Sequence, residues 1–260
     1  MFLVVALMMT ANISAQAKYR TVRTPDTSME VTFICGKPNL ASGKSWYRGI
    51  TGKSTIASIV FTNELPENLP VQETWDASEE WDDTVTAVVS GSTLYVSSNG
   101  GTGFKANSDM SYAFRDFVNL TSIEGLELID TSETTSLRGL FDNSQSLTSV
   151  DLNAWDTHNV TDISRAFRGC THLETINISD WDVSNVISME GMFQNDKYLR
   201  EINITGWSAG SLAKVFDAEN LFDGVGIATQ SLTVKVGSQE VADWIKAPER
   251  MFPDYGVIIT

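Results

Sequence analysis

The 260-residue chain has few of the residues that usually build metal centres and disulfide networks. It contains only two histidines, His158 and His172, and two cysteines, Cys35 and Cys170. Two cysteines in different regions cannot make a disulfide-rich scaffold, and their positions match no metal-ligand spacing. We interpret both as unpaired thiols, with a Cys35–Cys170 disulfide as the alternative in an oxidising compartment.

Basic residues are also scarce. The chain has 18 Lys and Arg against 33 Asp and Glu, which gives a net charge of −15. An acidic protein repels phosphate backbones, so nucleic acid is excluded as a partner. The acidic run at residues 76–83 offers the oxygen ligands that calcium prefers, but its spacing matches no calcium loop. We interpret this run as an exposed turn and expect no metal site.

Long apolar stretches are missing as well, because no run reaches transmembrane length. The main short run, residues 2–9, precedes Ala15-Gln16-Ala17, a small-x-small sequence typical of a signal peptidase site. We therefore predict a signal peptide over residues 1–17, with a core strand as the alternative. The mature protein is expected to be secreted or on the cell surface, without a transmembrane anchor.

The sequence carries no catalytic signature. It lacks a nucleophile elbow and a zinc-type histidine pair. Residues 49–54 resemble a phosphate-binding loop, but two residues separate the glycines where four are required. Asp156 and Asp182 occupy equivalent positions of a repeat, so we interpret them as turn caps. We expect no enzyme activity and no cofactor.

What the sequence does contain is a phrase that returns every 26 residues. A less regular copy around Phe114 precedes three clear copies, and a degraded copy follows them. Repeats of this length predict stacked units, each too small to bury its own apolar face. The strictly spaced positions are Phe141, Phe167 and Phe193; Leu147, Leu173 and Leu199; and Trp155, Trp181 and Trp207.

Each copy has the same internal order of patterns. The L-x-x-L-x-L run at residues 147–152 alternates as a short strand does, and a Trp-Asp turn follows it. Ile163 and Phe167 are four residues apart, which predicts about two helical turns facing the core. We interpret the Trp column as buried, with an exposed sugar-binding row as the alternative. The predicted fold class is therefore an α/β solenoid, a leucine-rich-repeat-like stack of strand-turn-short-helix coils.

The repeats divide the chain into four parts. These are a signal peptide (1–17), a β-rich leader (18–106), the repeats (107–227) and a C-terminal cap (228–260). We expect leader strands at residues 31–35, 56–61, 85–90 and 93–97, with a hairpin turn at 90–92. The cap is expected to be a strand (231–236), a helix (238–247) that Ser238 caps, and a strand (256–259).

The copies resemble a known family. Residues 167–173 (FRGCTHL) and 181–193 (WDVSNVISMEGMF) are similar to the phrase of the BspA-type leucine-rich-repeat surface proteins, also called Mycoplasma-lipoprotein-associated repeats. The resemblance covers roughly residues 56–212. It implies a bacterial protein, secreted or on the cell surface. Some members of that family act as adhesins, so we expect a host or neighbouring-cell surface or matrix protein as the partner.

The outward side of the repeat strands is the candidate binding surface, here called the strand face. Parallel strands in a repeat stack present such a face to partners, although it can also be merely solvated. We predict non-catalytic adhesion or protein-partner binding, with a glycan-binding module or a structural spacer as alternatives. The strand face comprises Ser149, Asp151, Asn153, Thr175, Asn177, Ser179, Glu201, Asn203 and Thr205.

The signal peptide makes the first testable prediction. Protein recovered from the secreting cell is expected to begin at Lys18, because cleavage follows Ala17. N-terminal sequencing checks this, and a chain that begins at residue 1 or 2 would contradict it.

Overall fold

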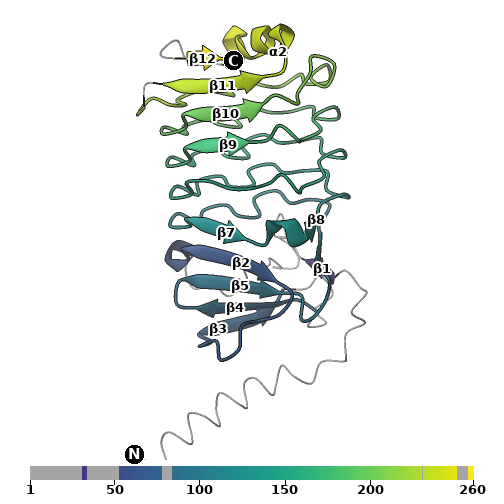
Figure 1. The fold of residues 1–260 in the computed structure, drawn as a ribbon, viewed down its shortest axis with the longest axis vertical. Coiled ribbons are helices and arrows are strands. Elements are labelled where there is room, and N and C mark those ends of the chain that lie inside the picture. Colours follow the sequence, from purple (N-terminus) through teal and green to yellow (C-terminus); the bar gives the residue numbers. More distant parts are fainter. Residues whose placement is uncertain (1–30, 34–52, 78–83, 230, 251–256) are drawn as a thin grey trace, which may run out of the picture.

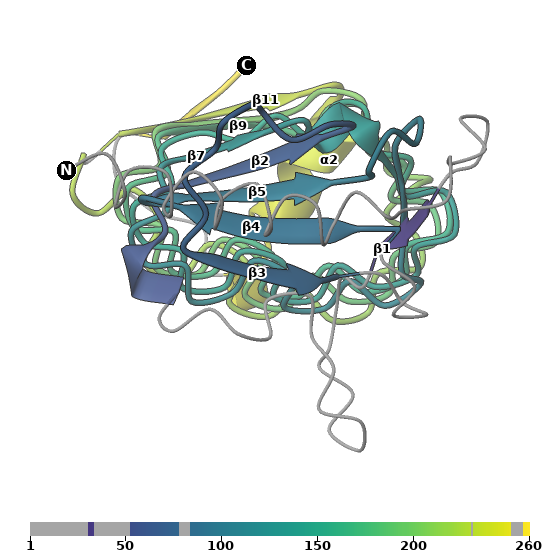
Figure 2. The same ribbon diagram turned by 90° about the horizontal axis from the view of Figure 1, so that it is seen from below.

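The computed structural model describes residues 31–33, 53–77, 84–229, 231–250 and 257–260. The predicted signal peptide, Cys35, the sequence at 49–52 and most of the acidic run lie outside the described residues. The described part forms an elongated stack, with β3 at one end and α2 at the other (Figure 1). Seen along the stack, the repeat copies superimpose on one another (Figure 2).

A five-stranded sheet forms the N-terminal end of the stack, in the order β3-β4-β5-β2-β7. Strand β4 pairs antiparallel with β3 and β5, whereas β2 pairs parallel with β5 and β7. Gly91, with φ 61°, lies in the turn between β4 and β5, so the predicted hairpin is confirmed. The strands are β2 (Ser58–Thr62), β3 (Glu73–Asp76), β4 (Thr86–Ser90), β5 (Thr93–Ser97) and β7 (Ser122–Glu124).

Two parallel sheets complete the fold. The smaller one has the order β1-β6-β8, and the larger one has the order β12-β11-β10-β9. Short 3₁₀ segments occupy Lys53–Thr55, Leu126–Leu128 and Pro248–Arg250. The strands are β1 (Val31–Phe33), β6 (Phe104–Ala106), β8 (Ile129–Asp130), β9 (Thr175–Asn177), β10 (Glu201–Ile204), β11 (Leu232–Val236) and β12 (Val257–Ile259).

The C-terminal strand, helix and strand are confirmed as β11, α2 (Gln239–Ile245) and β12. The Ser238 hydroxyl accepts a hydrogen bond from the Val241 N–H, at 3.4 Å, and so caps α2 as expected. Val241 and Ile245 are fully buried, which places the apolar side of the helix over the core.

The predicted fold class, an α/β solenoid of strand-turn-short-helix coils, is wrong. The described residues form one mixed sheet and two parallel sheets, and α2, which lies after the repeats, is their single α-helix. Where helical turns were expected in two copies, residues 164–169 and 190–195 form non-helical turns. The strand expected over 147–152 is not formed, although β9 and β10 are present in the next two copies.

Backbone conformation explains the missing helices. Arg165 and Gly191, in the middle of the expected helical segments, have left-handed φ values of 58° and 57°, which interrupt a right-handed helix. The N–H groups of Ile163, Arg165 and Phe167 donate to carbonyl oxygens of the next copy, at 3.0, 2.8 and 3.0 Å. A helix would direct these N–H groups to carbonyls within its own segment. Ile163 and Phe167 are only 1% and 0% exposed. Their four-residue spacing therefore indicates correctly that both side chains are buried, but it does not indicate a helix.

Stacked phenylalanine rings run through the core. The rings of Phe114, Phe141, Phe167, Phe193 and Phe222 follow one another with centroid separations of 5.1, 5.8, 5.8 and 6.0 Å. The Trp column is also confirmed as buried, because Trp155, Trp181 and Trp207 are each 3% exposed. The indole N–H groups of Trp155 and Trp207 donate to the carbonyl oxygens of Leu126 and Ile178, both at 3.1 Å.

The ring column predicts a large stability loss for Phe167→Ala. Phe167 contacts two stacked rings and Trp181, so the substitution leaves a cavity between copies. We expect the free energy of unfolding to fall by about 3–5 kcal/mol in urea titrations. Phe216→Ala is the matched control, because Phe216 is 80% exposed. Equal losses in the two variants would contradict the role of the column.

Candidate functional site

The strand face lies along one side of the stack, where β9, β10 and β11 continue the direction of β7, β2 and β5 (Figure 1). Parallel pairing aligns the copies in register, with Asn177 opposite Asn203 and Asn203 opposite Lys235. None of the nine predicted residues is buried. Ser149, Asp151, Asn153, Asn177 and Thr205 are exposed, and Thr175, Ser179, Glu201 and Asn203 are partly exposed.

The central residues of the strand face are held by their own backbone. Asp151, Asn177 and Asn203 each accept a hydrogen bond through Oδ1 from the N–H two residues later, at 3.0, 3.2 and 3.2 Å. These bonds fix the side chains. Asn177 is held further, because its Nδ2 donates to Asn153 Oδ1 at 3.4 Å, and Asn203 Oδ1 also accepts the Thr205 hydroxyl at 3.0 Å. Asn177 and Asn203 lie on paired strands, which are about 4.8 Å apart. Asp151 occupies the equivalent position of the preceding copy, where no strand is formed, and it extends the row.

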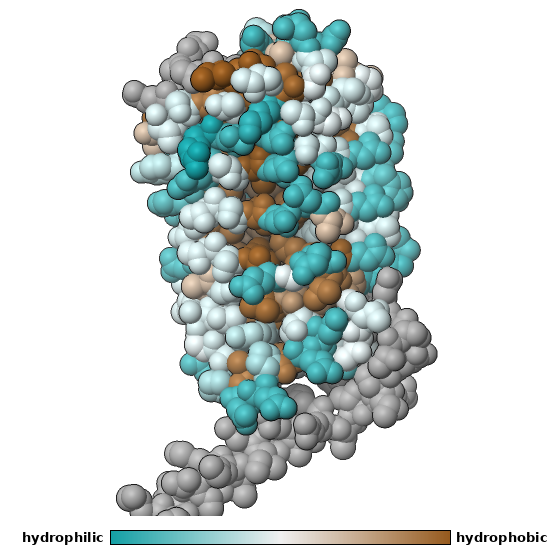
Figure 3. All heavy atoms as spheres, viewed as in Figure 1, coloured by the Kyte–Doolittle hydropathy of each residue, from teal (hydrophilic) through white to brown (hydrophobic). Residues whose placement is uncertain are grey.

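Ion pairs neutralise the charges beside this row. Glu201 pairs with Lys235 at 2.7 Å, and Glu174 pairs with Arg200 at 3.2 Å. In the space-filling view of this side, apolar residues show between the hydrophilic ones along the middle of the stack (Figure 3). The strand face is therefore mixed in polarity. The charges of Glu201 and Glu174 are balanced by those of Lys235 and Arg200.

The turns after the Trp column behave as the sequence predicts. Asp156 and Asp182 accept hydrogen bonds from the backbone N–H groups of His158 and Ser184, at 3.1 and 2.9 Å. The hydrogen bond from the His158 backbone lowers the pKa of Asp156. Bonds from the Ser184 side chain and backbone lower the pKa of Asp182. Their role as turn caps is confirmed.

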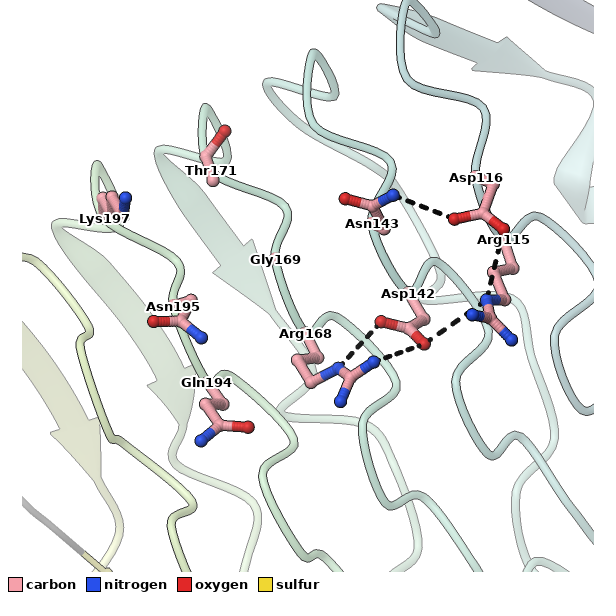
Figure 4. Close-up of a pocket in the computed structure, with 10 residues that line it drawn as sticks. All are labelled: Arg115, Asp116, Asp142, Asn143, Arg168, Gly169, Thr171, Gln194, Asn195 and Lys197. Atoms are coloured by element: carbon pink, nitrogen blue, oxygen red, sulfur yellow. Dashed lines mark hydrogen bonds and ion pairs between the residues drawn. The ribbon is translucent and has the colours of Figure 1, made fainter. Parts of the chain in front are cut away.

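The structure also contains a polar hollow that the sequence analysis missed (Figure 4). The hollow has a volume of about 470 Å³ and lies on the loop segments that precede the repeat strands. Its lining residues are Arg115, Asp116, Asp142, Asn143, Arg168, Gly169, Thr171, Gln194, Asn195 and Lys197.

One carboxylate organises the hollow. Asp142 has a side chain only 3% exposed, and it accepts hydrogen bonds from Nε and Nη2 of Arg168 at 2.9 and 3.0 Å. Arg115 lies on its other side, with Nε 3.6 Å from Asp142 and 3.3 Å from Asp116 (Figure 4). Two guanidinium groups thus meet at a single carboxylate.

The hollow follows from the repeat itself. Asp116, Asn143, Gly169 and Asn195 occupy equivalent positions and share left-handed φ values of 63°, 64°, 73° and 68°. The residues just before them are Arg115, Asp142, Arg168 and Gln194, so charge alternates over the first three copies and is absent in the fourth. Comparing positions 115, 142 and 168 between copies reveals the alternating charges in the sequence. They are missed when each of these segments is simply classed as a loop.

No group of three or more His, Cys, Asp or Glu side chains in the described ranges is arranged to hold a metal ion. No helix within those ranges has the length and apolar character needed to span a membrane. Cys170 is a buried free thiol, while His158 and His172 lie on the surface.

One family model matches the part of the chain that holds the repeats. Residues 108–234 match the family model described as "Mycoplasma protein of unknown function, DUF285". No curated protein and no solved structure matches the chain.

We predict that Asp142→Ala destabilises the fold, because Asp142 pairs with both Arg115 and Arg168. The substitution removes the acceptor that organises Arg115 and Arg168, so we expect a loss of about 2 kcal/mol in urea unfolding. Glu174→Ala removes an ion pair whose side chains are 53% and 55% exposed, and it should change stability by less than about 1 kcal/mol. A loss in Asp142→Ala no larger than in this control would contradict the assignment.

Proposed function

We propose that this chain is an extracellular, non-catalytic binding protein of the BspA-related type, which holds a macromolecular partner along its strand face. The observation that carries the proposal is the row formed by Asp151, Asn177 and Asn203, each fixed by a hydrogen bond to its own turn. The DUF285 match, together with the resemblance of the repeat phrase to BspA-type surface proteins, supports this class.

A protein partner suits the geometry of this row. Asn177 and Asn203 are aligned on neighbouring strands about 4.8 Å apart, so an extended partner meets repeated polar groups there. Side chains that are already fixed lose little conformational entropy on binding, which favours affinity. We propose a surface or matrix protein of a host or neighbouring cell as the partner.

A glycan is the second candidate, and the hollow is the observation that favours it. The buried Trp column cannot present ring faces to a sugar, so a glycan site built on those rings is not available. In contrast, the hollow combines guanidinium groups of Arg115 and Arg168 with the exposed amide of Asn195 and amine of Lys197. Such donors suit the hydroxyl and carboxylate groups of an acidic glycan.

The binding test uses residues 18–260 against a panel of matrix proteins and a glycan array. We expect the double substitution Asn177→Lys and Asn203→Lys to weaken protein binding at least about tenfold, or 1.4 kcal/mol. The reason is that it removes two aligned amides and inserts long charged side chains. Circular dichroism checks that the fold is retained.

Lys197→Glu is the matched control, because Lys197 is exposed and lines the hollow. It should leave binding at the strand face unchanged. Binding that is lost in Lys197→Glu and kept in the double variant would move the site to the hollow. Failure to bind any member of the panel or array would contradict a binding role and favour a structural spacer.

A further inference from the structure

A buried carboxyl group occupies a core column of the repeats. Ser144, Cys170 and Asp196 are spaced 26 residues apart, and all three are 0% exposed. The first two use their side chains in the same way. Ser144 Oγ donates to the carbonyl oxygen of Phe114 at 2.6 Å, and Cys170 Sγ donates to that of Phe141 at 3.2 Å. The column therefore links each copy to a phenylalanine carbonyl of the preceding copy.

The same column relation assigns Asp196 to the carbonyl oxygen of Phe167. In the preceding copy, the Phe141 oxygen accepts both the Ser144 N–H, at 2.9 Å, and Cys170 Sγ. The Phe167 oxygen accepts the Cys170 N–H at 3.0 Å, and a carbonyl oxygen can accept a second bond. Neither carboxyl oxygen of Asp196 has a hydrogen-bond partner. A protonated carboxyl group at Asp196 supplies the same kind of donor as Ser144 and Cys170, whereas a carboxylate does not.

Two backbone N–H groups act on the Asp196 carboxyl group, those of Gly169 and Cys170. Both already donate to other acceptors, the carbonyl oxygens of Gln194 and Phe167, at 2.8 and 3.0 Å. A negative charge at this position would be fully buried with no hydrogen bond to either oxygen, which is costly in a protein core.

The titratable groups that interact with Asp196 also oppose its charge. They are the buried Cys170 thiol and the carboxylate of Asp142, which is paired with Arg168. Burial raises the pKa of Asp196 well above its usual value, and Asp142 adds to this effect. The N–H groups of Cys170 and Gly169 offset part of the increase in pKa.

We propose that Asp196 is a proton-operated lock between the copy that contains Phe167 and the copy that contains Phe193. With its proton, the carboxyl group donates to the Phe167 carbonyl and closes the two copies together. When the proton leaves to solvent, the buried charge opens this junction. Asn195 and Lys197 flank Asp196 and line the hollow, so the lock adjoins the wall of the hollow in the sequence.

The sign of the pH dependence follows from the raised pKa of Asp196 in the folded state. Its stabilising contribution is complete below the unfolded value of about 4 and is lost as pH rises toward the folded value. Asp156 acts in the opposite sense, because its lowered pKa makes its contribution disappear as pH falls.

The test compares the wild-type chain with Asp196→Ser by urea unfolding from about pH 4.5 to 8.5. Serine is the residue that the chain itself places in this column at Ser144. The folding equilibrium constant of the wild type, relative to the variant, should fall by up to about tenfold per pH unit. Asp180→Ser, at an exposed position, should keep the pH profile of the wild type.

A second measurement does not depend on the folding of the serine variant. The carboxyl carbon of Asp196 in the wild-type chain, followed by NMR, should titrate with a midpoint well above the usual aspartate value of about 4. A midpoint at or below that value would overturn the proposal. The same pH profile in the wild type and in Asp196→Ser, or in Asp196→Asn, would overturn it as well.

Discussion

The phenylalanine column is the constraint on which the rest of the structure depends. Each of its central rings is buried between the rings of two neighbouring copies, so no copy can complete its own core. Phe61 packs edge-on against Phe114 at the N-terminal end, with the centroids 6.2 Å apart. Helix α2 lies over the other end, where Val241 and Ile245 are buried (Figure 1). Both ends of the stack are thus covered by elements outside the repeat.

The stacking of the copies also determines the arrangement of side chains on the strand face and in the hollow. Backbone hydrogen bonds between copies align equivalent residues, so any polar side chain that recurs in the phrase becomes a row on the surface. On the strand face this produces similar short polar groups, each fixed by its own turn. On the preceding loops it produces alternating arginine and aspartate, because residues at positions 115, 142 and 168 differ between copies.

The sequence predicted burial better than it predicted conformation. The burial of the Phe, Leu and Trp columns could be predicted, because stacking requires an apolar side chain at the same position in every copy. The helices were not, since the i to i+4 spacing of Ile163 and Phe167 fits a helix as well as it fits turns with a left-handed residue such as Arg165. The hollow and Asp196 depend on contacts between copies, which become visible only when unlike residues of one column are compared.

The central claim is that the stack binds its partner along the strand face. Hydrogen–deuterium exchange of residues 18–260, with and without a bound partner, tests it most directly because it locates the contact without any substitution. The account predicts slower exchange on binding at residues 149–153, 175–179 and 201–205. Protection confined to the loops at 115–116, 142–145, 168–171 and 194–197, with none on the strands, would contradict it.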